Sequence, residues 1–347
     1  MVSTLMSIPG AYAGGKLSDH YGRKKIYFIF QTSAALLLFS CAFTENPNAI
    51  ILLVSVSAFF NGGVRPVMSA IISDVLTPEK RQTGFSLSYL GINLGVAIGP
   101  IAAGFLFNNY IKWIFIGDAI TSFVAIILMM MFIKESIPDY TKTHDTPELE
   151  RTEKGHIFEA LRKRPRVILF LSINILFALV YTQHIFALPL MMTHVFGAEG
   201  PKNFGILCSL NAFTVLGMTM FVSGFVSKFS LNPLQCIALT GVLYAVGFGM
   251  IGFIHSMPLF LISTFIWTLG EILVVTNFGV YLANNSPQNF RARFSAVSSL
   301  SWSIGGSLGT AGVGLYISFF DIGAIWPPLT VISLIGALGM LALDRKK

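Results

Sequence analysis

The stretch GGKLSDHYGRKK, from Gly14 to Lys25, decides how this chain is interpreted. It gathers an aspartate, a histidine and four cationic side chains between an apolar start and a long apolar run. Charge is otherwise scarce, because charged residues make up 11% of the chain and hydrophobic residues 54%, whereas a soluble domain carries roughly a quarter charged residues. With a mean hydropathy of +0.72, the sequence predicts a protein of the lipid bilayer with a charged loop at this point.

Ten apolar runs are long enough to cross a bilayer as helices. A helix needs about 20 apolar residues to span the hydrocarbon core, where the backbone must satisfy its own hydrogen bonds. The alternating pattern of strands is absent, so we expect an all-α, polytopic membrane protein. The spans are predicted at residues 26–43, 49–72, 83–107, 113–133, 167–192, 204–227, 234–254, 259–283, 294–319 and 326–343. The start, residues 1–14, is interpreted as the end of a further span whose beginning is missing.

Positive charge is distributed unevenly between the loops. If successive loops alternate sides, twenty of the 23 Lys and Arg side chains lie on one side, Lys112 and Lys202 on the other, and Arg65 within a span. This is the positive-inside pattern, which predicts a cell-membrane protein with the opening loop, the polar segment 134–166 and the C-terminus in the cytoplasm. The net charge of +7 is therefore interpreted as an orientation signal, and no nucleic acid is expected as a partner.

Two segments of the chain resemble each other. LTPEKRQTGFSLSYLGINLGVAIGPIAAG from Leu76 parallels NSPQNFRARFSAVSSLSWSIGGSLGTAGVG from Asn285, with matching prolines and phenylalanines 209 residues apart and matching glycines 210 apart. An old duplication leaves such an offset. We predict two helical bundles, at residues 1–133 and 167–347, joined by a linker at 134–166. Within the linker, HIFEALRKR (156–164) is a solvated connector or a short amphipathic helix on the membrane surface.

The opening stretch resembles the cytoplasmic loop signature of the major facilitator superfamily. The matching residues are Gly15, Leu17, Ser18, Asp19, Gly22, Arg23, Lys24 and Lys25. His20 departs from the pattern, since a permanent cation is usual at its position. The resemblance covers the whole chain and implies two pseudo-symmetric six-helix bundles. In that fold the ten spans are helices 3 to 12, and the first helix and a half would be missing.

The resemblance also implies a mechanical role for this loop. Asp19 would cap the N-terminal end of a helix in the other half, helix 11, and Arg23 would pair with Asp74 at the end of helix 4. Together with Gly15 and Gly22, these residues form the predicted cytoplasmic latch, and breaking its contacts would favour opening inward. The corresponding segment of the second half, GFVSKFS (224–230), keeps the glycine and the serine but has no aspartate.

A second resemblance lies in the span predicted at residues 83–107, which is helix 5 of the family fold. GVAIGPIAAG is similar to the pattern of proton-coupled antiporters, with Gly95, Gly99, Pro100 and Gly104 in place and Ala103 where a glycine is usual. Small residues allow two helices to approach closely, and proline bends a helix. The motif is therefore a predicted hinge or seal, and ordinary tight packing is the alternative.

Three charged side chains lie inside predicted spans, namely Arg65, Asp118 and Glu271. Each costs about 2.5 to 3.5 kcal/mol at the middle of a helix on insertion scales. Glu271 lies halfway along the span predicted at residues 259–283, which is helix 10 of the family fold. It is the predicted proton-coupling residue, because a carboxyl in an apolar cavity can exchange a proton near neutral pH. A structural carboxyl paired with a neighbouring helix is the alternative. LGE at this depth resembles many drug-efflux members of the family, while Asp118 is interpreted as an interfacial carboxylate.

Arg65 belongs to a polar stripe along the span predicted at residues 49–72, which is helix 4 of the family fold. This stripe is predicted to face a water-filled cavity. The stripe consists of Ser57, Asn61, Arg65, Ser69 and Ser73. The repeat sets Arg65 at the depth of Glu271, so we predict that the two charges pair or that Arg65 holds an anionic group of the substrate. Static stabilisation is an equal alternative. The helix 4 arginine of the antiporters, which precedes a glycine, is not found before Gly62 or Gly63.

The span predicted at residues 167–192, helix 7 of the family fold, carries polar groups that suit a substrate pocket. Asn174, Tyr181 and His184 share one face and Gln183 lies on another, while Trp267 precedes Glu271 by one turn. Hydrogen-bonding groups among aromatic rings are typical of pockets for amphipathic organic molecules. His184 by itself is interpreted as a packing residue.

Several other functions are not indicated by the sequence. Metal-ligand clusters, phosphate loops and nucleotide fingerprints are absent, and GGSLG (305–309) lies in an apolar helix where a nucleophile elbow cannot form. The three cysteines, Cys41, Cys208 and Cys236, are interpreted as small buried hydrophobes. We therefore predict a transporter without enzymatic activity or a cofactor, driven by an ion gradient.

The predicted function is proton-coupled efflux of amphipathic organic compounds by alternating access, carried out by a monomer in the bilayer. Proton-driven uptake of peptides or metabolites is an alternative, because YLGINLGV (89–96) resembles helix 5 of proton-dependent oligopeptide transporters. A truncated, non-transporting product is a third.

Overall fold

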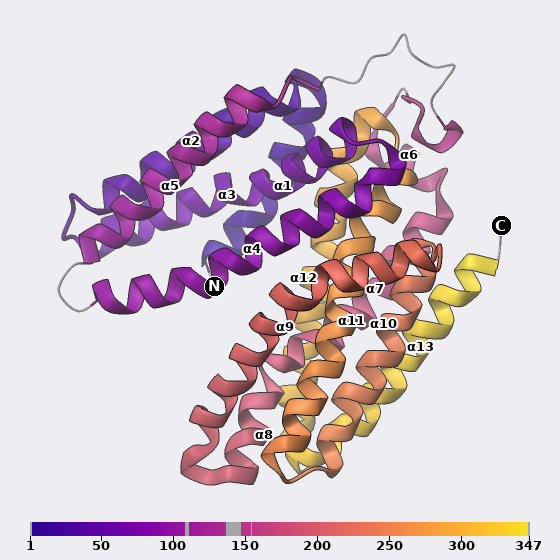
Figure 1. Ribbon diagram of the computed structural model, residues 1–347. Helices are drawn as coiled ribbons and strands as arrows, with labels where there is room; N and C mark the ends of the chain where they lie inside the picture. Colours follow the sequence, from indigo (N-terminus) through magenta and orange to yellow (C-terminus); the bar gives the residue numbers. More distant parts are fainter. Residues whose placement is uncertain (1, 108–110, 137–146, 154, 346–347) are drawn as a thin grey trace. The chain divides into compact units, whose positions relative to one another are not determined.

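A computed structural model describes residues 2–107, 111–136, 147–153 and 155–345 (Figure 1). All regular structure in these residues is helical. The chain forms two compact units, which are described separately. Unit 1 contains Met1–Arg81, Gly95–Lys163 and Leu282–Leu300, and unit 2 contains Gln82–Leu94, Arg164–Tyr281 and Ser301–Lys347. Helices α4 (Pro78–Phe107), α11 (Met257–Asn284) and α12 (Arg291–Ile317) contribute to both units. The division into bundles at 1–133 and 167–347 therefore stays a prediction.

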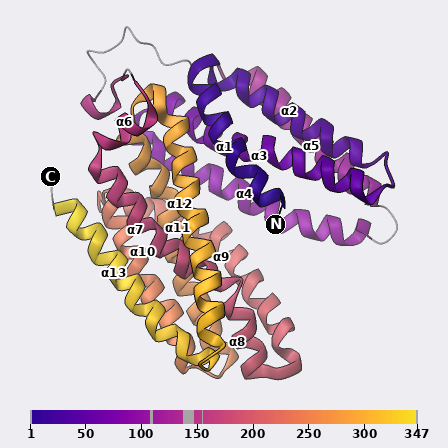
Figure 2. The same cartoon turned by 180° about the vertical axis from the view of Figure 1, so that it is seen from behind.

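Unit 1 is built on three helices that pack side by side, α2, α3 and α5 (Figures 1 and 2). Its complete helices are α1 (Val2–Tyr21), α2 (Arg23–Cys41), α3 (Pro47–Val75), α5 (Ile111–Phe132) and α6 (Ile157–Arg162), with a 3-10 turn at Glu148–Glu150. Ile26, Tyr27 and Phe30 of α2 pack with Val67 of α3 and Ile126 of α5 in its core. Asn46 caps α3 by accepting a hydrogen bond from the Asn48 amide at 3.0 Å.

Helix α1 packs unusually closely on α3 because glycines face each other. A Cβ at Gly10 would lie 1.8 Å from the Phe59 carbonyl oxygen, and one at Gly14 would lie 2.6 Å from the Gly63 Cα. Such small residues let two backbones approach closely, and they are enriched where membrane helices pack.

Unit 2 contains the remaining helices. They are α7 (Pro165–Tyr181), α8 (Ala187–Phe196), α9 (Gly200–Lys228), α10 (Pro233–Met250) and α13 (Trp326–Arg345), with parts of α4 (Pro78–Phe107), α11 (Met257–Asn284) and α12 (Arg291–Ile317). Prolines at the first turn of α7 and α10 favour their start. Helices α10 and α13 lie against each other (Figure 1), and a Cβ at Gly241 would lie 2.7 Å from the Ser333 carbonyl oxygen.

The span predicted at residues 167–192 is interrupted. Helix α7 ends at Tyr181, a 3-10 turn covers Thr182–His184, and α8 starts at Ala187. The His184 ring donates a hydrogen bond from Nδ1 to the Tyr181 carbonyl at 2.6 Å, and Pro189 has no N–H to donate to the carbonyl four residues earlier. Both features weaken the helical ladder at this level of the chain.

The other nine predicted spans each coincide with a helix. By length and composition, six segments of the described residues are long and apolar enough to cross a membrane, one of which, Pro165–Lys228, contains α7, α8 and α9. Cys41 and Cys236 are buried, as predicted, but Cys208 is exposed. A helix in a bilayer turns one face to lipid, so an apolar position does not have to be buried in protein.

Candidate functional site

Glu271 lies on α11 at the centre of a hydrogen-bonded site in unit 2. Its Oε1 accepts hydrogen bonds from the hydroxyls of Tyr89 and Tyr181, both at 2.7 Å. Its Oε2 accepts one from Asn211 Nδ2 at 2.8 Å, and the same amide nitrogen donates to Thr268 Oγ1 at 3.0 Å. We call Glu271, Tyr89, Tyr181 and Asn211 the Glu271 site. Four helices, α4, α7, α9 and α11, each contribute one of these residues.

Glu271 is 5% exposed as a residue, and its carboxylate is held by neutral donors. In the described part of the chain, its hydrogen-bond partners include no Lys or Arg. Three donors and no acceptor are the partners that suit an ionised carboxylate. Within the described part of unit 2, the carboxylate is thus held by neutral groups, which suit the binding of a proton or of a positively charged group.

Aromatic rings surround the Tyr181 side of this site. The Tyr181 ring centroid lies 4.2 Å from that of His184, 5.6 Å from Trp302, 6.1 Å from Tyr244 and 6.4 Å from Trp267. The Tyr244 hydroxyl and Trp267 Nε1 are buried without a hydrogen-bond partner among the described residues. Unpaired buried polar atoms are costly, so this wall offers binding groups that the protein itself does not use.

Asn174 on α7 and Gln183 in the turn after α7 are both fully buried. Asn174 Nδ2 lies 3.5 Å from Ser301 Oγ, and Gln183 Nε2 donates to the Leu179 carbonyl at 2.8 Å. The carbonyl oxygens of both amides have no partner in the described residues. The structure therefore brings Tyr181 and Trp267 to the Glu271 site, whereas Asn174 and Gln183 carry separate unsatisfied oxygens.

The polar stripe on α3 belongs to unit 1. Asn61 and Arg65 are exposed, while Ser57 and Ser73 are buried and donate to carbonyls of their own helix. Because Glu271 lies in unit 2, its predicted pairing with Arg65 stays a prediction.

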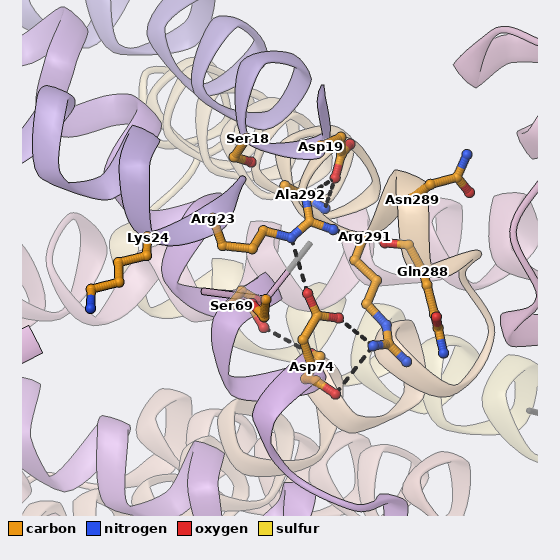
Figure 3. A network of polar contacts seen from close by, with 12 residues as sticks. Ser18, Asp19, Arg23, Lys24, Ser69, Asp74, Gln288, Asn289, Arg291 and Ala292 are labelled. Carbon is orange, nitrogen blue, oxygen red and sulfur yellow. Dashed lines mark hydrogen bonds and ion pairs between the residues drawn. The ribbon is translucent and has the colours of Figure 1, made fainter. Parts of the chain in front are cut away.

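The residues of the opening loop meet in a buried ionic cluster of unit 1 (Figure 3). Arg23 forms ion pairs with Asp19 and, at 3.0 Å from Nε to Oδ2, with Asp74. Its Nη2 also donates to the Gln288 carbonyl at 2.7 Å. The side chains of Asp19 and Arg23 are fully buried, although charged groups are rarely buried unless they are paired.

Asp19 lies at the N-terminal end of α12. It accepts hydrogen bonds from the amides of Ala292 at 3.4 Å and Arg293 at 3.3 Å, and its Oδ2 pairs with Arg293 Nε at 2.7 Å. A negative charge is stabilised there by the free amides and the helix dipole. Burial raises the pKa of the Asp19 carboxyl, and the two arginines oppose this effect. A Cβ at Gly15 would lie 2.9 Å from the Ala292 carbonyl oxygen, so the glycine allows this approach.

Glu150 of the linker completes the cluster and was not predicted from the sequence. Its carboxylate pairs with Arg81 at 2.8 Å and also with Arg291. Arg291 in turn pairs with Asp74. We call these residues the loop cluster: Asp19, Arg23, Asp74, Arg81, Glu150, Arg291 and Arg293.

The sequence repeat contains a signal for part of the cluster. Arg81 and Arg291 are 210 residues apart, as are Asp74 and Asn284. The contacts cross between the repeats: Arg81 of the first repeat donates to Asn284 Oδ1 of the second, and Arg291 of the second repeat pairs with Asp74 of the first. Glu150 lies between the two equivalent arginines.

Gly22 joins α1 and α2 with a φ of +105°, a conformation that only glycine adopts easily. The carboxylate of Glu135, beyond the end of α5, lies against it and accepts hydrogen bonds from the amides of Lys24 and Lys25 at 3.0 and 3.1 Å. Glu135 thus caps α2.

The antiporter-like motif lies on α4. A Cβ at Gly95 or Gly99 would meet no atom within 4 Å among the described residues. The side chain of Pro100 and the surroundings of Gly104 lie outside what the structure describes. Its role as a hinge or seal stays a prediction. In the described residues, no group of three or more His, Cys, Asp or Glu side chains is arranged to hold a metal ion.

Comparison with known proteins gives consistent matches. The family model of the Major Facilitator Superfamily matches residues 1–310. An uncharacterized MFS-type transporter of Bacillus subtilis, YqjV, is 22% identical over 98% of this chain and 81% of its own length. A Na(+), Li(+), K(+)/H(+) antiporter of Planococcus maritimus is 21% identical over 88% and 77%. Multidrug resistance protein 2 of B. subtilis is 24% identical over 100% and 84%.

A solved structure supports the same fold. The crystal structure of the human organic anion transporter MFSD10 (TETRAN) matches with a TM-score of 0.76, over 98% of this chain and 82% of that one, at 13% identity.

Proposed function

Because this chain belongs to the Major Facilitator Superfamily, whose members are transporters and not enzymes, we propose that it exports amphipathic organic compounds in exchange for protons. The Glu271 site carries this proposal. A buried carboxylate whose described hydrogen-bond donors are neutral can bind either a proton or a cationic group, and the competition between them couples the two fluxes. The names of an antiporter and of a multidrug resistance protein among the relatives support exchange and efflux.

The proposed cycle uses two helical bundles, residues 1–133 and 167–347, that rock about a central cavity. Glu271 takes up a proton from outside and releases it to the cytoplasm. Asn61, Arg65, Asn174, Gln183 and Trp267 would line the cavity with Tyr181, and the rings around Tyr181 would accept the apolar part of a substrate. The loop cluster would be the cytoplasmic latch, and Gly95, Gly99, Pro100 and Gly104 would form the hinge or seal.

In this proposal the protein is a monomer of the cell membrane, with its linker and C-terminus in the cytoplasm. The paired arginines and the helix end at Asp19 support a latch, because such contacts are strong in one arrangement of the helices and lost in another.

Proton coupling can be tested with the protein in proteoliposomes that carry an imposed pH gradient. Addition of ethidium, a cationic fluorescent amphiphile, should dissipate the gradient, as reported by a pH-sensitive dye. Glu271→Gln should reduce this dissipation at least tenfold, because the amide cannot be protonated. Asp118→Asn removes the other carboxyl of a predicted span, which is exposed on α5, and should leave the dissipation unchanged.

The same assay separates the proposal from its competitors. Gradient dissipation that persists in Glu271→Gln would exclude proton coupling through this residue. Since one relative is named as an antiporter of Na(+), Li(+) and K(+), these ions are tested beside ethidium. A response to the metal ions alone would replace the organic substrate class with monovalent cations.

A further inference from the structure

The first half of α4 is attached to the helices of unit 2. We call residues 82–94 the docking segment; they fall in unit 2, whereas the rest of α4 falls in unit 1. The Tyr89 ring packs with Val215 and Ile272, and three further contacts are specific. The Tyr89 hydroxyl donates to Glu271 at 2.7 Å, Ser86 Oγ lies 2.9 Å from Ser223 Oγ on α9, and the Phe85 ring packs on the α11 backbone at Gly279.

Only one of these contacts depends on a charge. The serine pair and the Phe85 contact are neutral and do not respond to protons. The Tyr89 bond ends on a buried carboxylate, and a hydrogen bond to an ionised acceptor is roughly twice as strong as one between neutral groups. Protonation of Glu271 leaves a neutral bond in its place, so the docking segment is held less tightly.

Among the described residues that hydrogen-bond to Glu271, Tyr89 is the one that lies on α4. The Glu271 carboxylate accepts its other hydrogen bonds from Tyr181 on α7 and Asn211 on α9. Two other titratable side chains, Tyr244 on α10 and His184 in the turn after α7, interact electrostatically with Glu271. Helices α7, α9 and α10 and the turn after α7 lie wholly in unit 2, and Glu271 lies in the unit 2 part of α11. Tyr89 is the contacting residue that lies on α4, which continues into unit 1.

From this geometry we infer that Tyr89 is a positioning residue that transmits the protonation of Glu271 to α4, releasing the docking segment when the carboxyl takes up a proton. The inference rests on the proposed proton coupling, and it explains how a proton bound at a carboxylate alters the contact between helices.

The serine pair offers a direct reporter of docking. In a variant whose three native cysteines are replaced by alanine, Ser86→Cys and Ser223→Cys place two thiols where the hydroxyls now touch. Oxidative cross-linking of this pair in proteoliposomes is measured across a pH series. Each yield is divided by that of the same pair carrying Glu271→Gln, which removes the pH dependence of thiol oxidation itself.

We expect the normalised yield to fall about fivefold from alkaline to acidic pH, the change expected for losing charge assistance in one hydrogen bond. Tyr89→Phe should abolish this pH response. Tyr181→Phe, which removes a bond to the same oxygen from α7, should retain it.

A flat yield with the native Tyr89, or equal pH responses in Tyr89→Phe and the parent, would overturn the inference. Its failure is distinguishable from failure of the proposed function. If Glu271→Gln abolishes gradient dissipation while Tyr89→Phe leaves docking unchanged, the coupling stands and the link through Tyr89 does not. If Glu271→Gln still couples transport, the proposed function fails first.

Discussion

Two buried carboxylates, Asp19 and Glu271, show how the same chemical group is used in opposite ways. Asp19 pairs with Arg23 and Arg293 and caps α12. Glu271 is as deeply buried but receives hydrogen bonds from two tyrosines and an asparagine. The first carboxylate is matched by fixed positive charge, whereas the described unit 2 partners of the second are neutral dipoles.

This difference separates a structural contact from an exchangeable site. The loop cluster contains four arginines and three acids, so removal of any one acid leaves buried guanidinium groups uncompensated, which is costly. Neutral donors around Glu271 impose no such penalty when its charge is lost. We therefore expect substitutions in the loop cluster to act on stability, and substitution of Glu271 to act on transport.

The largest effect on stability is expected for Asp19→Asn. It removes the partner of the buried Arg23 and the half-buried Arg293 and should lower the free energy of unfolding by about 4 kcal/mol. Thermal unfolding in detergent measures this change. Lys16→Gln, an exposed charge in the same loop, is the control and should unfold like the parent. A stability loss below that of Glu271→Gln would contradict the comparison.

Glu150→Gln should cost about 3 kcal/mol, because Arg81 and Arg291 both lose their shared carboxylate. Glu148→Gln lies two residues earlier in the same turn and is exposed, so its effect should be negligible. Limited proteolysis of the linker, together with unfolding, reports the change. Equal behaviour of the two variants would show that the linker acid is not part of the loop cluster.

Gly22→Ala should cost about 2 kcal/mol through backbone strain, since its φ of +105° is unfavourable for any side chain. The added methyl would also meet the Glu135 carboxylate. Gly117→Ala, on α5, adds a methyl where no described atom lies within 4 Å and should be neutral or slightly stabilising. If both glycines tolerate alanine equally in unfolding measurements, the connection between α1 and α2 is not strained.

The smallest stability effect is expected for Glu271→Gln, about 1 kcal/mol or less, because one hydrogen bond to Asn211 is lost and the tyrosine hydroxyls keep an acceptor. Its transport defect should nevertheless be the largest of the four variants, in the gradient assay described above. A variant that unfolds several degrees earlier and also fails to transport would show that Glu271 is structural.

The helical segments were predictable because they follow from local composition. A run of apolar residues bounded by charges must form a helix in a bilayer, whatever its neighbours, and nine of the ten runs coincide with one continuous helix. The break in the tenth run was not predicted, since it depends on the His184 ring bonding to its own backbone and on Pro189. Two of the three cysteines were assigned correctly as buried, and Cys208 was wrong.

The repeat also relates contacts that were not predicted. Glu135 and Asp344 are 209 residues apart. Glu135 accepts from the amides that start α2, and Asp344 accepts from Asn232 and Gln235 at the start of α10. Glu135, just after the end of α5, and Asp344, in the last turn of α13, thus each hold the start of another helix. The position equivalent to Asp19 is Lys228, which lies over the Phe229 ring, so the second loop has no buried acid.

From its residues alone, this chain specifies a helical membrane protein, its repeat, its family-like loop and the unusual depth of Glu271, because hydropathy, charge and spacing are local properties. The tertiary structure decided which donors surround that carboxylate and that Glu150 joins Arg81 and Arg291. Tyr89, Asn211 and Glu150 are ordinary polar residues in the sequence, and their roles arise only where distant helices and the linker meet. A hydrogen bond between such elements depends on the way they pack, which no spacing along the chain encodes.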